Sequence, residues 1–180
     1  MPLRNRMRTQ MCERLTAMFV CSALSLIAAT GFARADTIGR YQCGVIGTIA
    51  QEQIGDRNGH LLVSFEYSCL GVDGLLKDAV ATAVSVSEWD GPRGPYLASL
   101  GLHRAPGGFA VGQLLEGTGF LLMKDGSPAG NEASGRTFFK FASGTLASLS
   151  EKTVKFTTKP IGLGRFELEF TDTPALGGTK

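Results

Sequence analysis

Residues 61–69 of this 180-residue chain, Leu61-Leu62-Val63-Ser64-Phe65-Glu66-Tyr67-Ser68-Cys69, alternate between apolar and mostly polar side chains. Successive side chains of a β-strand point to opposite faces, so a period of two indicates a strand with one buried face. The side chains expected to face the core are Leu61, Val63, Phe65, Tyr67 and Cys69.

A second strand is predicted before this one, over residues 38–49. The two would be joined through Asn58-Gly59, a dipeptide that favours tight hairpin turns. Their antiparallel pairing would bring Cys43 close to Cys69, so we expect a disulfide between these two cysteines. It would close a loop of about 27 residues and stabilise the fold by roughly 3–4 kcal/mol. The alternative is two separate buried thiols.

Further alternating segments follow along the rest of the chain. Residues 77–89 fit a helix or a strand, and their β-branched side chains favour the strand. The other predicted strands cover residues 96–104, 109–116, 120–124, 137–142, 152–158 and 166–170, with a short helical turn over residues 146–149.

These segments predict an all-β fold of about eight to ten strands. Glycine, with 24 residues in the chain, separates the segments and indicates tight turns. An open sheet of that many strands would leave bare edges, so we expect a closed or nearly closed antiparallel β-barrel. A β-sandwich is the alternative fold.

The N-terminal segment predicts export. Arginines precede an apolar stretch, and Ala33-Arg34-Ala35 resembles a signal cleavage site. We therefore expect a cleaved signal peptide over residues 1–35, a single barrel domain over 36–171, a flexible tail over 172–180, and a periplasmic or secreted protein. A less favoured alternative is an uncleaved membrane anchor.

Charge excludes some partners of the exported chain. Five of the 18 basic and one of the 16 acidic side chains lie before Asp36, which leaves a net charge of about −2. No basic block remains for a phosphate backbone, so we expect no nucleic-acid partner. Three Tyr and one Trp are few for the aromatic girdles of a transmembrane barrel, so we expect no stable membrane insertion after cleavage.

Three glycine-containing segments carry a resemblance to a known group of proteins. They are Glu88-Trp89-Asp90-Gly91-Pro92, Ala133-Ser134-Gly135-Arg136 and Phe141-Ala142-Ser143-Gly144-Thr145-Leu146. Over roughly residues 77–170 the chain resembles small exported bacterial proteins of unassigned function. Its layout is similar to the β-barrel of allene oxide cyclases and dirigent proteins. The resemblance implies a fold and carries over no catalytic residue.

The sequence carries no convincing motif for a metal site, a cofactor site or a catalytic nucleophile. His60 and His103 are isolated, without ligand spacing around them, and we expect no metal site. The proline in Gly126-Ser127-Pro128-Ala129-Gly130 is unsuited to a nucleophile elbow. Neither Gly117-Thr118-Gly119 nor Gly162-Leu163-Gly164 opens a helix that could hold a phosphate, so we expect no cofactor.

One set of polar and aromatic residues in or near the predicted strands forms the candidate ligand-binding site. If the barrel encloses a cavity, some of them would line it and orient a small ligand among apolar side chains. For any single one, an ordinary solvent-facing position is the more frequent outcome. The candidates are Glu88, Trp89, Tyr96, His103, Gln113, Glu116 and Arg136, with Lys140 as a further member.

The first functional hypothesis is an exported barrel that binds a small hydrophobic or aromatic ligand in its interior. The second is an enzyme of the cyclase or isomerase type, with Glu88 or Glu116 as a general acid or base in the pocket. The third is a structural or partner-binding envelope protein, which an exposed apolar patch would favour. The oligomeric state is left open by all three hypotheses.

Overall fold

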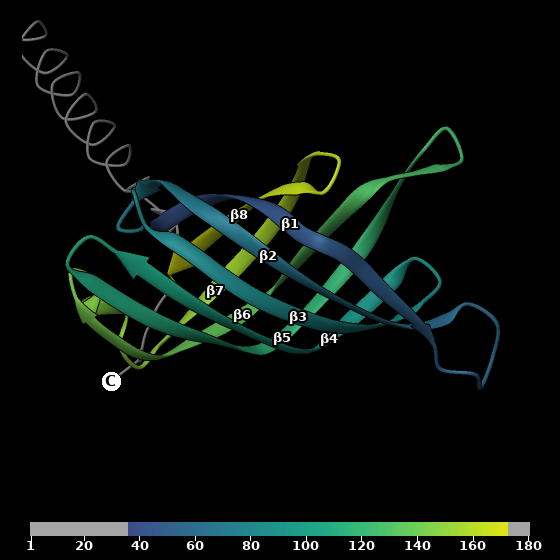
Figure 1. Ribbon diagram of the computed structural model, residues 1–180, viewed down its shortest axis with the longest axis horizontal. Helices are drawn as coiled ribbons and strands as arrows, with labels where there is room; N and C mark the ends of the chain where they lie inside the picture. Colours follow the sequence, from purple (N-terminus) through teal and green to yellow (C-terminus); the bar gives the residue numbers. More distant parts are fainter. Residues whose placement is uncertain (1–35, 173–180) are drawn as a thin grey trace, which may run out of the picture. The chain divides into compact units, whose positions relative to one another are not determined.

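The computed structural model describes residues 36–172, which form one antiparallel β-barrel (Figure 1). Each strand pairs with its neighbours in chain order, and β8 returns to β1, so the barrel is closed. The strands are β1 (Thr37–Gln53), β2 (His60–Gly74), β3 (Val80–Asp90), β4 (Arg93–Ala105), β5 (Gly108–Lys124), β6 (Ser127–Gly144), β7 (Lys152–Gly162) and β8 (Arg165–Asp172). The predicted all-β fold and closed antiparallel barrel are confirmed, and the strand number is eight.

The alternation in residues 61–69 has the predicted consequence. Cys69 is buried and Tyr67 packs against the core, whereas Glu66, on the opposite face of the strand, is exposed. Cys43 and Cys69 are directly opposite each other in the β1–β2 register and form the expected disulfide. Two independent sequence signals, alternation and cysteine placement, therefore identify the same pair of strands.

Three expectations need correction. Residues 109–116 and 120–124 are one continuous strand, β5, in which Leu115 is an extra, bulged residue opposite β6. Unbroken alternation over the predicted strand 137–142 would put Phe139 and Phe141 on one face, but a bulge at Lys140 turns Phe141 outward and leaves it 56% exposed. Residues 77–79 lie in the turn before β3, so that strand begins at Val80.

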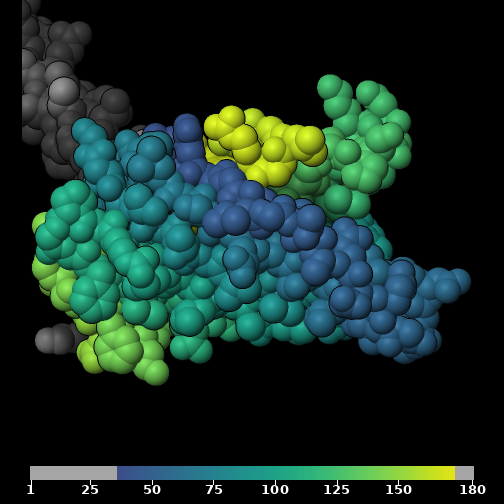
Figure 2. All heavy atoms as spheres, viewed as in Figure 1, coloured from purple at the N-terminus to yellow at the C-terminus, as the bar shows by residue number. Residues whose placement is uncertain are grey.

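One end of the barrel is filled with side chains. The turn before β3 inserts Leu76, and the 3₁₀-helix η1 (Ala147–Leu149) inserts Leu149, at the position of the predicted helical turn. A Cβ atom at Gly71 would collide with the backbone of Leu76, so glycine lets this turn fold tightly over the barrel end. The opposite end carries the β1–β2, β3–β4, β5–β6 and β7–β8 hairpin turns, and several of them project beyond the wall (Figures 1 and 2).

Candidate ligand-binding site

A cavity of about 60 Å³ lies within the barrel, above the filled end. Half of its lining is apolar and mostly aromatic, and the other half carries hydroxyl groups. The apolar side chains are Phe65, Leu114, Phe156, Phe166, Leu168 and Phe170. The hydroxyl-bearing side chains are Tyr67, Ser85, Tyr96, Ser99, Thr137 and Thr158.

Three hydroxyl groups form a cluster on the wall of β2, β3 and β4. The Ser85 hydroxyl donates a hydrogen bond of 2.9 Å to the Ser99 hydroxyl. Burial raises the pKa of Tyr67, and side-chain hydrogen bonds with Ser99 and Ser85 partly oppose that rise. Burial also raises the pKa of Tyr96 to about 12, with a smaller contribution from the nearby Tyr67. Both phenols are therefore neutral at physiological pH, and none of the residues that line the cavity is charged.

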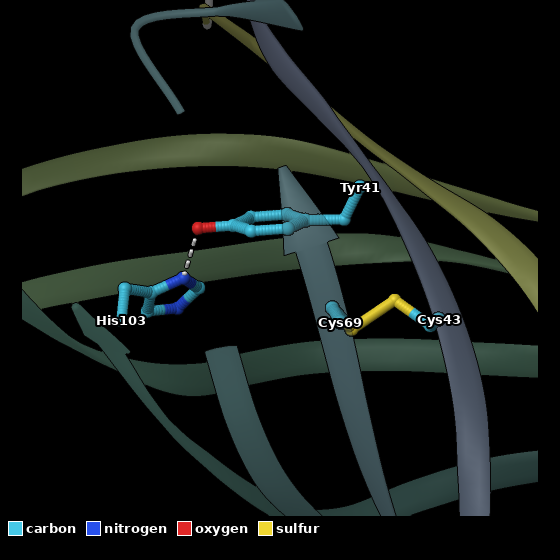
Figure 3. The surroundings of a disulfide bond; sticks show 4 residues. All are labelled: Tyr41, Cys43, Cys69 and His103. Atoms are coloured by element: carbon cyan, nitrogen blue, oxygen red, sulfur yellow. Dashed lines mark hydrogen bonds between the residues drawn. A yellow bond between two sulfur atoms is a disulfide. The ribbon is translucent and has the colours of Figure 1, made fainter. Parts of the chain in front are cut away.

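Tyr41 and His103 pack against Phe170, which lines the cavity, and Figure 3 shows their two side chains facing each other. The Tyr41 hydroxyl and His103 Nδ1 are hydrogen bonded at 2.9 Å, next to the Cys43–Cys69 disulfide. The His103 ring makes edge contacts with Phe139 and Phe170. Burial lowers the pKa of His103 to about 4, so its imidazole is neutral at pH 7.

Three of the seven candidate residues lie inside the barrel. Tyr96 lines the cavity, and His103 is buried against Phe170, which also lines it. Trp89 is half-buried, its ring packs close to Gly94 and Gly119, and its Nε1 donates a hydrogen bond of 2.8 Å to the Ser87 hydroxyl. A ligand-binding role for these residues stays a prediction.

The other four candidates lie outside the lumen. Glu116 and Arg136 form an exposed ion pair at 2.7 Å on the outer face of β5 and β6. Gln113 is exposed on β5, and Glu88 faces the β1–β2 turn, where it contacts His60. Strand parity places them there, because their neighbours in sequence take the inner positions.

The inner hydroxyl cluster was missing from the sequence-based site. In β3 the valines at positions 80, 84 and 86 lie on the outer side, whereas Ser85 and Ser87 are buried. The usual rule of apolar inside and polar outside is therefore inverted along this strand. Tyr67 had a usable signal, since the alternation of residues 61–69 already pointed it inward.

A separate group of charges surrounds His60, on the outside of the hairpin end. His60 Nδ1 lies 2.6 Å from Asp56 Oδ1, and its Nε2 lies 2.7 Å from Glu88 Oε1. These hydrogen bonds raise the pKa of His60, and the bond with Asp56 has the larger effect. His60 itself is only 5% exposed. Within residues 36–172, no group of three or more His, Cys, Asp and Glu side chains could hold a metal ion.

In comparisons with known proteins, no family model, curated protein or solved structure matches the chain. The resemblance to the allene oxide cyclase and dirigent barrels therefore stays a prediction. In the described part of the chain, no helix has the length and apolar character needed to cross a membrane.

Proposed function

We propose that this protein is an exported binding module that holds a small, neutral, hydrophobic or aromatic ligand in its barrel. The observation that carries the proposal is the cavity, where aromatic side chains surround a hydroxyl cluster formed by Tyr67, Ser85 and Ser99. Such a mostly apolar pocket with a few oriented polar groups is typical of small-molecule sites.

The polar groups define the class of ligand. Hydroxyl groups both donate and accept hydrogen bonds, so they suit an alcohol, a phenol or a carbonyl group. A carboxylate or an ammonium ion would lose its hydration without an opposite charge among the lining residues. The ligand is therefore neutral, with one hydrogen-bonding group on an apolar body.

The disulfide supports export. Cys43 and Cys69 are both buried and bonded, and such bridges persist in oxidising compartments. The predicted signal peptide lies outside the described residues, so the compartment is part of the proposal.

Titration of the exported protein with 2-naphthol, followed by calorimetry, tests the proposal. Wild-type protein should bind this neutral aromatic alcohol, and 2-naphthoic acid, its anionic analogue, should bind at least tenfold more weakly. Tyr67→Phe and Ser99→Ala should each weaken 2-naphthol binding about five- to tenfold, the effect of one lost hydrogen bond. Ser134→Ala, an exposed serine of β6, is the control. Equal affinity in all four proteins would remove the hydroxyl cluster from the site.

The two carboxylates suggested as the general acid or base of an enzyme do not line the cavity. Glu88 and Glu116 lie outside the lumen, and no carboxylate is among the residues that line the cavity. An enzyme acting in this cavity would have to use its neutral hydroxyl groups.

The partner-binding hypothesis has one observation in its favour. Val84 and Leu100 are paired across β3 and β4 on the outer face and are 44% and 53% exposed, and Phe141 on β6 is also exposed. Sedimentation velocity over a hundredfold concentration range tests the simplest partner, a second copy. Self-association that Phe141→Ser abolishes would support it, and a monomer throughout would count against it.

A further inference from the structure

The wall of the barrel is interrupted between β4 and β5. These strands pair up to Pro95 with Thr118 and resume at Leu100 with Gln113, in the same register. Between these pairs, residues 96–99 of β4 and 114–117 of β5 have no partners in this ladder. The two strands therefore separate and rejoin without slipping, which leaves a gap in the hydrogen-bonded wall.

A β-bulge lies in each strand at this interval. Leu97 is the extra residue of β4 opposite β3, because Val86 pairs with Ala98 and Ser87 with Tyr96. Leu115 is the corresponding extra residue of β5 opposite β6. Bulges bend the strand that carries them, so the pair of bulges explains why these strands part here.

A groove of about 410 Å³, lined mostly by apolar side chains, lies over the gap. Its residues come from both sides of the wall. Those on the outer face are Val84, Val86, Leu97, Ala98, Leu100 and Gln113. Ser99 and Leu114 complete it, and both also line the inner cavity. The groove and the cavity therefore share these two side chains in their walls.

The volumes decide how a ligand can fit. A dry cavity of about 150 Å³ encloses one benzene ring. The inner cavity has about 60 Å³, which is less than half of that. A ligand with a complete ring therefore needs space beyond the lumen, and the groove supplies it.

We propose that the ligand reaches its site sideways, through the gap between β4 and β5, and remains bound across the wall. This inference rests on the proposed function and adds its route and its orientation. The hydrogen-bonding group of the ligand lies at Ser99 and the cluster behind it, and its apolar body lies between Leu97, Ala98 and Leu114. The ligand class is a neutral amphiphile larger than the inner cavity, with a hydroxyl or carbonyl group at one end.

Stopped-flow binding of 2-naphthol tests this route. Ala98 is exposed in the groove and does not line the inner cavity, so Ala98→Phe narrows the gap from outside. We expect this variant to lower the association rate and the affinity at least tenfold. Ala50→Phe, at an exposed alanine of β1, is the matched control and should leave both unchanged. Leu61→Phe narrows the barrel at the end that carries the β1–β2 and β3–β4 turns. This variant should leave the association rate within twofold of wild type.

Wild-type rates in Ala98→Phe would overturn the lateral route, as would slow association in Leu61→Phe alone. If wild-type protein itself binds no 2-naphthol, the proposed function fails, which is a different outcome. Should Ala98→Phe fail to fold, Ala98→Cys can be folded first and then alkylated with N-ethylmaleimide. Alkylation should reproduce the tenfold loss, whereas alkylated Ala50→Cys should bind as wild type does. Unchanged binding after alkylation at position 98 would again overturn the route.

Discussion

The Tyr41 hydroxyl is hydrogen bonded to His103 Nδ1 across the barrel, at 2.9 Å, and both side chains are buried. One residue comes from β1 and the other from β4, so this contact ties together strands that are not neighbours in the wall. It also supports the cavity from behind, because Phe170 packs on both rings and lines the cavity. The stability of the barrel and the position of Phe170 in the cavity wall therefore depend on the same pair.

His103 should make the protein less stable in mild acid. Its pKa is about 4 in the folded barrel, against an ordinary value of 6.5. Between these two pH values the unfolded chain binds a proton that the folded protein does not. The stabilising contribution of the neutral His103 ring to folding is therefore complete above pH 6.5 and falls as the pH drops toward 4. The loss amounts to about 3 kcal/mol at most. Urea unfolding at pH 4.5 and 7.5 measures this loss. In His103→Gln the free energy of unfolding should differ less between the two pH values than it does in wild-type protein. An unchanged difference would contradict the assignment.

His60 should have the opposite pH dependence. Asp56 and Glu88 raise its pKa in the folded state, so folding favours the protonated ring. Its stabilising effect is therefore complete below pH 6.5, its ordinary pKa, and is lost as the pH rises through the higher folded value. His60→Asn should lower the melting temperature more at pH 5 than at pH 9. A decrease that is equal at both pH values would indicate a packing role without the charge.

Gly94 should be required for the position of the Trp89 ring. A Cβ atom at residue 94 would overlap that ring, so Gly94→Ala should destabilise the barrel by about 1–3 kcal/mol through overpacking. Gly44→Ala is the control, since a Cβ atom there meets nothing within 4 Å. Trp89 is the only tryptophan of the chain, so its fluorescence reports both the local change and unfolding. Equal unfolding midpoints for the two variants would show that the ring moves aside freely.

The strand pattern of this chain was predictable because one face of each strand is buried. In residues 61–69 the buried face is large and apolar, so the alternation indicated both the strand and its inner side. Apart from Trp89, the inner positions of β3 hold alanine and serine, and bulky side chains such as Phe156 and Phe166 enter the lumen from other strands. Small residues on the inner side resemble a solvent-facing pattern, and the hydroxyl cluster was missed for that reason.

The bulges were the other limit of sequence reasoning. Leu97, Leu115 and Lys140 each shift strand parity by one residue, and a period-two pattern carries no signal for such an insertion. Glu116 and Arg136, which the candidate ligand-binding site included, both lie outside and pair with each other, as charged side chains on strands usually do. The gap between β4 and β5 depends on two of these bulges, so it became visible only in three dimensions.

The disulfide should contribute a large part of the stability of the barrel. Cys43 and Cys69 are 26 residues apart in sequence, and cross-linking a loop of that length stabilises by about 3–4 kcal/mol on the chain-entropy model. Reduction of wild-type protein keeps both sulfur atoms in place, so urea unfolding with and without dithiothreitol isolates the cross-link. Cys43→Ala/Cys69→Ala also removes two buried sulfur atoms, and its loss should exceed that of the reduced protein. An unfolding midpoint that does not respond to reduction would show that register and packing alone hold β1 against β2.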